Sequence, residues 1–443
     1  MSKIERHMVW LVVLAIFFSE VKTGSHQNDI KDEKKYAVEI DARKNKPIHV
    51  KLLALGEKTV NFETVCQAFV RALLYTDQFT VDVEYKNKKP KKTEVQELKK
   101  SGYNWVVFLD YNTHEHAYEW RLYDTAKGIM QKGFRVPREG QVVRGWGYAL
   151  ADSFISATTN NKPFACSKLA YCETTKKGES IVWVADFDGS HEQVLSRSKR
   201  QILASSWNRD PENPLVMYSK YTSCNIQLIS CSLDGSEVVA SSFDGLNMQP
   251  AFSQDGKEVV VCLSRDGSSQ LYHYGFNKKL NKVGYTRLTY NTGNNFGPTF
   301  LDNGDLVFCS DFELGKPHLY YLDRKADAIE RLTEGNSCTS AQYSSLNGKI
   351  VYSKMVDGIM QLFLYDLGNK KEKQLTFDPV HKSECVWSAC GNYVAYVAQE
   401  GEKTKRIMAY SLLTGKKKYL SQPDKICSYP SWSTVYRALP IVA

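Results

Sequence analysis

Three short motifs in the sequence contain side chains that can bind a metal or a phosphate group, and each lacks part of the required pattern. His-Glu-His at 114–116 has zinc ligands, but a zinc hydrolase needs two histidines four positions apart on one helix, whereas these lie two apart between expected strands. Gly-Trp-Gly at 145–147 resembles part of a dinucleotide loop without its third glycine. Asp-Phe-Asp-Gly at 186–189 resembles the start of a calcium loop without the later acidic ligands. We interpret the three as a turn, a flexible helix entry and a hairpin turn.

Two further signatures of catalysis or metal binding are missing from the 443 residues. No G-x-S-x-G turn, which holds the nucleophile of α/β-hydrolases, occurs anywhere in the chain. Neither a C-x-x-C pair nor clustered histidines, the usual ligands of zinc, occur either. The sequence therefore predicts no catalytic residue, no metal site and no cofactor.

The eleven cysteines are many for an exported chain, and their odd number leaves at least one unpaired. Cys385 and Cys390 flank an expected strand turn closely enough to pair. Four others fall within apolar strand patterns, where a buried free thiol is the default. These are Cys172, Cys231, Cys262 and Cys309.

The N-terminus has the pattern of an export signal. Basic residues come first, and the eleven residues 8–18 are apolar, which is too short to span a bilayer but right for a signal-peptide core. We expect a signal peptide at 1–25, cleaved near Ser25, with an uncleaved anchor as the alternative. The net charge is +9, and much of it lies in a lysine run at 86–100. Because no aromatic residues interleave with these lysines, we expect a solvated face and no nucleic acid, rather than an anionic partner.

The second part of the chain contains a repeat with a period near 45 residues. Aromatic residues recur at successive separations of 45, 48, 43, 44 and 45, each followed by a turn with glycine and two β-rich runs. They are Trp207, Phe252, Phe300, Tyr343, Trp387 and Trp432. Four short strands per 45 residues are typical of a β-propeller blade.

The two ends of the repeat complete each other. Trp432 begins a unit that then stops, whereas 168–196 has three strands without an opening aromatic strand. A last strand that fills the first blade leaves no free edge at the seam. We therefore predict a six-bladed β-propeller over 167–436, preceded by a linker at 158–166 and followed by a tail at 437–443.

Residues 26–157 have a different pattern, which predicts a small α/β sandwich domain. Strands are expected at 36–40, 48–55, 79–85, 105–111, 118–123 and 129–136, and helices near 93–101 and 145–156. A further helix follows Asn61, and its apolar face is formed by Phe62, Val65, Cys66, Phe69 and Leu73. Length and pattern thus indicate two domains.

The segments just before the innermost strands should converge at one mouth of the propeller channel. Aromatic, methionine and amide side chains there suit a protein partner, because such residues dominate protein interfaces. The candidate mouth residues are Asn247, Met248, Gln249, Asn295, Phe296, Glu384 and Tyr429. Two alternatives remain open: a propeller hydrolase or lyase, and a propeller that binds peptidoglycan or another glycan.

The export signal, the extended strand after it, the α/β domain, "PAFS" at 250–253 and "PSWS" at 430–433 together resemble the TolB family of the Tol-Pal envelope system. The resemblance implies a non-enzymatic periplasmic scaffold that supports outer-membrane integrity and cell division. It implies binding of the lipoprotein Pal at the propeller mouth and of TolA through an N-terminal strand. We also expect a monomer.

The family's N-terminal strand ends in Ile-Asp, which "YAVEID" matches here. Its residues are Tyr36, Ala37, Val38, Glu39, Ile40 and Asp41. A strand that adds to a partner's sheet edge binds through backbone hydrogen bonds. Because one segment cannot serve its own sheet and a partner's at once, we expect strand release and Pal binding to be coupled.

Overall fold

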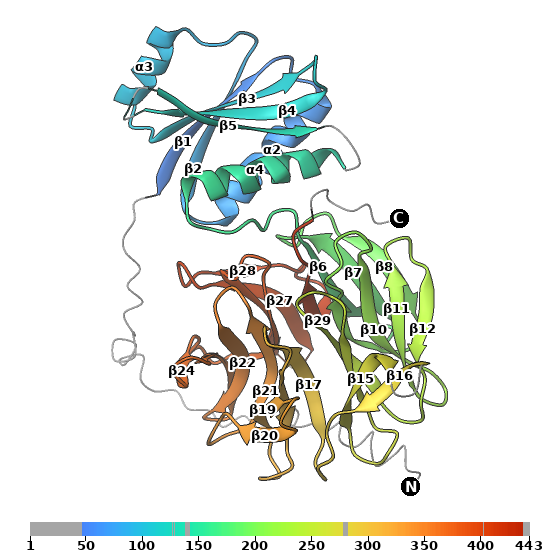
Figure 1. The fold of residues 1–443 in the computed structure, drawn as a ribbon. Coiled ribbons are helices and arrows are strands. Elements are labelled where there is room, and N and C mark those ends of the chain that lie inside the picture. The colour runs from blue at the N-terminus through green and yellow to red at the C-terminus, as the bar shows by residue number, and fades with distance from the viewer. Residues whose placement is uncertain are drawn as a thin grey trace.

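The computed structural model describes residues 47–125, 127, 129–137, 142–277, 282–401 and 403–436. The predicted signal peptide (1–25), partner strand (Tyr36–Asp41) and tail (437–443) lie outside these residues. A small unit of one sheet and three helices lies against one end of a ring of sheets (Figure 1). Within the described ranges, no helix has both the length and the apolar character needed to cross a membrane.

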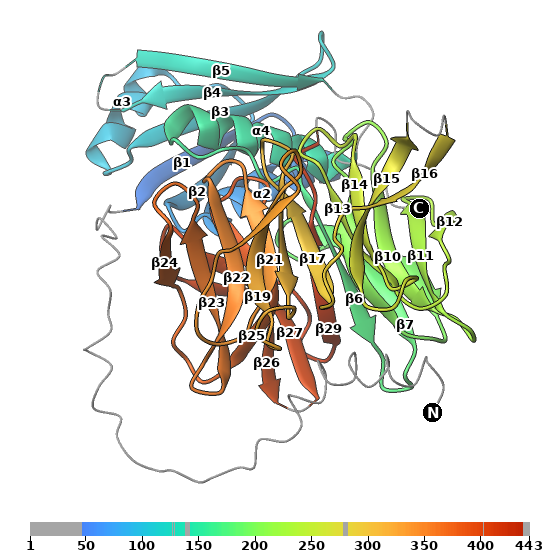
Figure 2. The same cartoon turned by 60° about the horizontal axis from the view of Figure 1, so that its bottom comes forward.

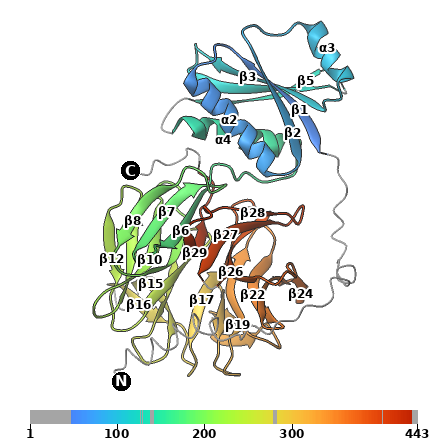
Figure 3. The same ribbon diagram turned by 180° about the vertical axis from the view of Figure 1, so that it is seen from behind.

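The N-terminal unit has a five-stranded sheet in the order β2-β1-β3-β4-β5, in which β1 runs parallel to β2 and β3. The strands are β1 Ile48–Leu55, β2 Phe79–Lys86, β3 Trp105–Asn112, β4 Ala117–Asp124 and β5 Ile129–Pro137, and the helices are α2 Val60–Tyr75, α3 Lys92–Lys100 and α4 Val143–Thr158. Helices α2 and α4 cover the face of the sheet toward the propeller (Figure 3). Leu98 of α3 packs on the opposite face.

Helix α2 begins where Thr59 accepts a hydrogen bond from the backbone N–H of Phe62, at 3.3 Å, which is a typical N-cap. The five residues that were predicted to form its apolar face are all buried, so this prediction is confirmed. Residues 145–147 lie inside α4, not in a flexible entry. Gly147 packs directly on α2, because a Cβ at this position would lie 2.3 Å from the carbonyl oxygen of Val65.

Six four-stranded antiparallel sheets form the propeller, which confirms the predicted fold (Figures 1 and 2). From the innermost strand outward, the first three are β9 Ile202–Trp207, β10 Leu215–Tyr221, β11 Ile226–Ser232 and β12 Glu237–Ser241; β13 Asn247–Phe252, β14 Val259–Leu263, β15 Gln270–Asn277 and β16 Lys282–Arg287; and β17 Asn295–Phe300, β18 Leu306–Ser310, β19 His318–Asp323 and β20 Ala328–Arg331. The others are β21 Cys338–Ser344, β22 Lys349–Val356, β23 Ile359–Asp366 and β24 Lys371–Gln374; β25 His381–Trp387, β26 Tyr393–Gly401, β27 Thr404–Ser411 and β28 Lys417–Tyr419; and β29 Ile426–Trp432, β6 Lys168–Thr174, β7 Ser180–Asp186 and β8 Gln193–Ser198. The last blade pairs β29 with β6, as the split repeat predicts.

Each periodic aromatic residue lies at or next to the end of an innermost strand and packs in a hydrophobic cluster. Trp207, for example, is 3% exposed and packs with Val182 and Val184 of the neighbouring blade. Trp387 packs in the same way with Leu362 and Leu364 of the blade before it. The repeat in the sequence is therefore a repeat of contacts between blades.

One hydrophobic core crosses the boundary between the two units. Tyr75 at the end of α2 packs against Phe164, Phe187 and Tyr393, with ring centroids 5.8, 5.0 and 5.1 Å away. All four rings belong to the cluster that also contains the core of the N-terminal sheet. Because this contact is apolar and buried, it fixes the two units relative to each other.

Asp186, which was interpreted as part of an ordinary hairpin turn, is a fully buried charge at this boundary. It accepts hydrogen bonds from Arg144 (2.6 Å) and Tyr148 (3.2 Å) of α4, and it pairs with Lys168 (2.9 Å) and His191 (3.0 Å). Burial alone raises the pKa of this carboxyl, but the hydrogen bond from His191 and the charges of Lys168 and Arg144 hold it well below its ordinary value. The turn is therefore part of the domain contact.

All eleven cysteines are free thiols, and Cys224 alone is exposed. The proposed pairing of Cys385 with Cys390 is wrong. Cys385 contacts the carbonyl oxygen of Ser340 in the preceding blade, at 3.0 Å, whereas Cys390 contacts Ser388 beyond the end of β25. The four cysteines predicted to be buried free thiols are buried, as expected.

Candidate functional site

A cavity of about 600 Å³ follows the central channel of the propeller and is lined by all six innermost strands. These strands end near the N-terminal unit, because Ser433, just after β29, donates to the carbonyl of Lys168, where the linker enters the first blade. We call this end of the channel the rim. The other end, where the innermost strands begin, is the mouth, and it faces away from the N-terminal unit.

Six residues with left-handed backbone form a ring around the channel on the mouth side. Each lies three positions before the periodic aromatic residue, where the pairing with the next strand shifts register. The ring is Ala204, Gln249, Gly297, Ser340, Glu384 and Tyr429, with φ between 52° and 59°. Only one is glycine, and left-handed backbone costs other residues about 1–2 kcal/mol each. Such bulges re-aim side chains, here along the channel.

Hydrogen bonds connect this ring from blade to blade. Gln249 accepts from the backbone N–H of Gly297 at 2.8 Å, and Ser340 accepts from that of Glu384 at 3.1 Å. The Glu384 carboxylate in turn accepts from the backbone N–H of Tyr429. These bonds join Gln249 to Gly297, and Ser340 to Glu384 and Tyr429, across neighbouring blades.

Glu384 is the only acidic side chain among the residues that line the cavity. Burial raises its pKa, while Lys405 and the Tyr429 N–H oppose this shift. Burial also raises the pKa of Tyr429, and the charge of Glu384 adds to this effect. Tyr429 thus presents a neutral hydroxyl. Glu384 presents a carboxyl that a cationic or hydrogen-bonding group of a partner would stabilise.

The predicted mouth residues lie in two different environments. Gln249, Glu384 and Tyr429 belong to the ring and line the channel. Phe296 is half-buried and packs against the clusters on both sides of its blade. These four remain candidates for partner contact.

The other three predicted residues lie inside the structure. Asn247 and Asn295 are 0% exposed, and Met248 is 7% exposed in the core between blades. Asn247 donates to the carbonyls of Ile226 and Phe243, at 2.8 and 2.7 Å, so it holds the loop before its strand. The sequence placed these residues in loops, but each innermost strand begins earlier than predicted, so their side chains are buried and not available to a partner.

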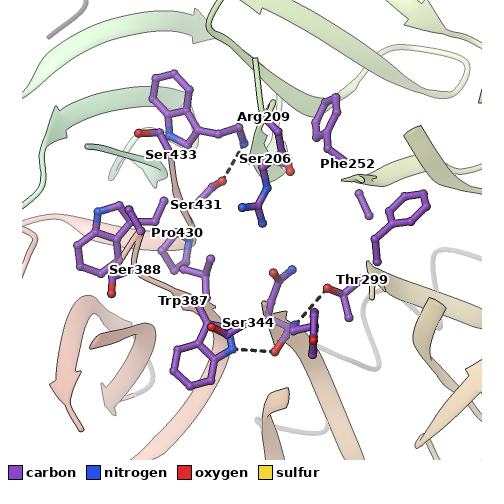
Figure 4. A pocket seen from close by; sticks show the side chains of 18 of the residues that line it. Ser206, Arg209, Phe252, Thr299, Ser344, Trp387, Ser388, Pro430, Ser431 and Ser433 are labelled. Carbon is purple, nitrogen blue, oxygen red and sulfur yellow. Dashed lines mark hydrogen bonds between the residues drawn. The ribbon is translucent and has the colours of Figure 1, made fainter. Parts of the chain in front are cut away.

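One channel residue has no counterpart in the predictions. Arg209 lies two positions after Trp207, where the other blades have Gln254, Asp302, Ser345, Ala389 and Thr434. Its guanidinium points into the cavity (Figure 4). Aligning the repeats on their aromatic residues would have identified it as the only basic side chain at this position.

Residues 114–116 lie in the turn between β3 and β4, where Asn112 accepts from the backbone of His114 and Glu115. Across the part of the chain that the structure describes, no three His, Cys, Asp or Glu side chains are grouped to hold a metal ion.

Fold and channel together define a six-bladed β-propeller with a small α/β unit fixed at the rim of its channel. The family model described as the TolB beta propeller domain matches residues 156–436, which is more than half of the chain. The chain therefore belongs to the TolB β-propeller family.

Curated relatives are similar in sequence, and a solved structure is similar in fold. The Tol-Pal system protein TolB of Francisella tularensis subsp. mediasiatica (strain FSC147) is 26% identical over 270 residues, which are 58% of this chain and 60% of that protein. The TolB of F. tularensis subsp. holarctica (strain OSU18) is 29% identical over 186 residues, 40% of this chain and 42% of that protein. These matches span less than two thirds of the relatives' length. The crystal structure of TolB from Acinetobacter baumannii matches with a TM-score of 0.72 and 20% identity, over 87% of this chain and 96% of that one.

Proposed function

We propose that this protein is a non-enzymatic periplasmic scaffold of a Tol-Pal system, which binds a Pal-like lipoprotein at the mouth of the propeller channel. The observation that carries the proposal is the ring. Left-handed backbone in all six blades places Gln249, Glu384 and Tyr429 at one depth, where a loop or helix end of a partner would meet all three. The family assignment supports Pal as that partner.

Within this ring, each candidate has a distinct role. Tyr429 and the half-buried Phe296 supply aromatic surface, which is enriched in the centres of protein interfaces. Glu384 and Gln249 supply hydrogen-bonding groups that select a polar or cationic group of the partner. The outer loops of the mouth would then exclude water from this centre.

The second partner in the proposal is a TolA-like protein, bound through the strand Tyr36–Asp41. The strand lies before β1, which is the second strand of its sheet. Backbone pairing with a partner's sheet edge would need little side-chain identity. In this arrangement the two partners bind at separate places, one on the propeller and one on the N-terminal segment.

Affinity measurements with the soluble domain of a Pal lipoprotein test the mouth. We expect Tyr429→Ala and Phe296→Ala each to weaken binding about tenfold or more, as truncation of a central aromatic residue does. Lys325→Ala, an exposed residue of the β19–β20 hairpin at the rim end, is the control and should leave the Kd unchanged. Unchanged affinity in both mouth variants would contradict the proposed site.

A protein that begins at Asp41 tests the N-terminal strand separately. It should retain Pal binding and lose capture of the periplasmic domain of TolA. Full TolA binding by the shortened protein would show that another surface is used.

A further inference from the structure

The rim half of the channel has a positive charge that no described residue neutralises. Arg209 extends from the end of β9 into the cavity (Figure 4), and none of the residues that the structure describes hydrogen-bonds to its guanidinium or forms an ion pair with it. The neighbouring Asp210 instead accepts from the backbone of Glu212 and the side chain of Asn213. Asp302, which occupies the equivalent position two blades away, accepts from the hydroxyl of Tyr343.

The other charged groups of the cavity make its two ends differ in charge. Lys162 of the linker also lines the cavity, and its side chain is exposed. Glu384 belongs to the ring, three residues before the periodic aromatic residue of its strand, which is roughly 10 Å at about 3.3 Å per residue, whereas Arg209 lies beyond the end of β9. The rim half is therefore basic, and the mouth half is acidic.

An unpaired guanidinium in a narrow cavity is unfavourable for the protein alone. Burial lowers the pKa of Arg209, because the walls remove water from the charged form. Arg209 is half-buried, and a charge that loses part of its hydration without gaining a partner is unfavourable, so an anion that binds there restores part of the lost interaction. The guanidinium fork fits the two oxygens of a carboxylate with parallel hydrogen bonds.

The walls around Arg209 combine polar with apolar side chains, and none of the lining residues in this half is acidic. Hydroxyl and amide side chains from several blades line this half of the cavity. They include Ser206, Gln254, Thr299, Gln342, Ser344 and Ser433. Several of these groups also join the blades: Ser431 accepts from the backbone N–H of Trp207 at 2.8 Å, and Thr299 from that of Tyr343 at 3.1 Å (Figure 4). The walls can thus form hydrogen bonds with a polar ligand without opposing its negative charge.

We propose that the rim half of the channel is a second binding site, in which Arg209 holds the carboxylate of a small polar ligand. The site is separate from the mouth that is proposed to bind Pal. The whole channel cavity, of which the rim half is one part, has a volume in the range of small-molecule sites. A ligand there would also touch the linker at Lys162 and Pro163, and so would contact the segment that joins the two units.

Isothermal titration of the full chain with paired probes tests the proposal. The carboxylate probes are N-acetyl-trialanine and glucuronate, which distinguish a peptide end from an acidic sugar, and their neutral partners are N-acetyl-trialanine amide and glucose. We expect one carboxylate probe to bind with a Kd of about 10 mM or lower, and its neutral partner about tenfold more weakly. Arg209→Gln should reduce carboxylate binding by the same factor.

Thermal unfolding in an anion-poor buffer gives an independent readout. Because Arg209→Gln removes an unpaired charge, this variant should melt at the same temperature as the parent or higher, and it should lose the upward shift that the carboxylate probe causes in the parent. The matched control is Arg197→Gln, at an exposed position on the outer strand β8, which should keep both carboxylate binding and the upward shift in melting temperature.

Failure of both carboxylate probes to bind the parent at 50 mM, or equal binding by Arg209→Gln, overturns the proposal. Pal binding at the mouth can be measured on the same variants and is expected to be unchanged, so failure of one site is distinguishable from failure of the other.

Discussion

Asp186 shows how one residue can determine the contact between the two units. Its carboxylate is fully buried and shared by Arg144 and Tyr148 of α4, by His191, and by the buried Lys168 at the start of β6. A buried ion pair adds little stability over an apolar contact, but removal of one member leaves the other unpaired. The turn motif at 186–189 gave no sign of this role, because its partners come from distant parts of the chain.

Replacement of this carboxylate should therefore be costly. We expect Asp186→Asn to lower the free energy of unfolding by about 3–5 kcal/mol, since it leaves the Lys168 ammonium without its counter-ion. Urea denaturation of the variant measures this loss. Asp424→Asn, an exposed position before β29, should change stability by less than about 0.5 kcal/mol.

The same residue predicts a pH dependence with a definite sign. The pKa of Asp186 is lower in the folded protein than the value of about 3.9 in an unfolded chain. Its contribution to stability is thus fully present above about pH 4 and is lost as the pH falls through the folded pKa. Denaturation curves between pH 7 and pH 3 should show a smaller loss of stability for Asp186→Asn than for the parent; identical slopes would contradict this role.

At the scale of elements, the sequence predicted the repeated features of the blades but not the residues that interrupt the alternation within the innermost strands. The 45-residue period, the blade number and the closing strand follow from six aromatic residues, because each packs between blades at an equivalent place. The start of each innermost strand was predicted as a loop, because a left-handed residue such as Gln249 or Glu384 interrupts the alternation of a strand. The environments of Asn247 and Asn295 were missed for the same reason.

Helix α4 provides a test at this scale. Gly147 brings α4 so close to α2 that a Cβ would lie 2.3 Å from the carbonyl of Val65 and 2.7 Å from the Cβ of Ala68. Gly147→Ala should therefore destabilise the protein by about 1–3 kcal/mol or more, despite the higher helix propensity of alanine. Thermal denaturation measures the change. Gly284→Ala, where no atom lies within 4 Å of the added Cβ, is the matched control and should have little effect.

For the whole molecule, the important feature is the continuous core between the two units. Phe187 lies between Tyr75, Tyr148 and Phe164, with ring centroids 5.0 to 5.2 Å away, and is 0% exposed. A contact of this kind couples the stability of both units. The two should therefore unfold together, in one calorimetric transition.

Phe187→Ala should break this coupling. We expect a loss of about 3–5 kcal/mol, as for other buried phenylalanines, and two transitions in place of one, because the cavity opens at the boundary. Phe308→Ala removes an equally buried ring within the propeller, so it should lower the melting temperature without dividing the transition. Two transitions in the parent protein would argue against the coupling.

The pairing of β29 with β6 has a consequence for biosynthesis. The blade that is translated first lacks its innermost strand until Ile426–Trp432 has left the ribosome, more than two hundred residues later. Until then the inner edge of β6 exposes unpaired backbone, and Lys168 and Ser167 lack Ser433 and Trp432 as partners. A nascent chain interrupted anywhere before β29 is thus left with an open strand edge that can pair with other chains, so the ring can close only after β29 has been made.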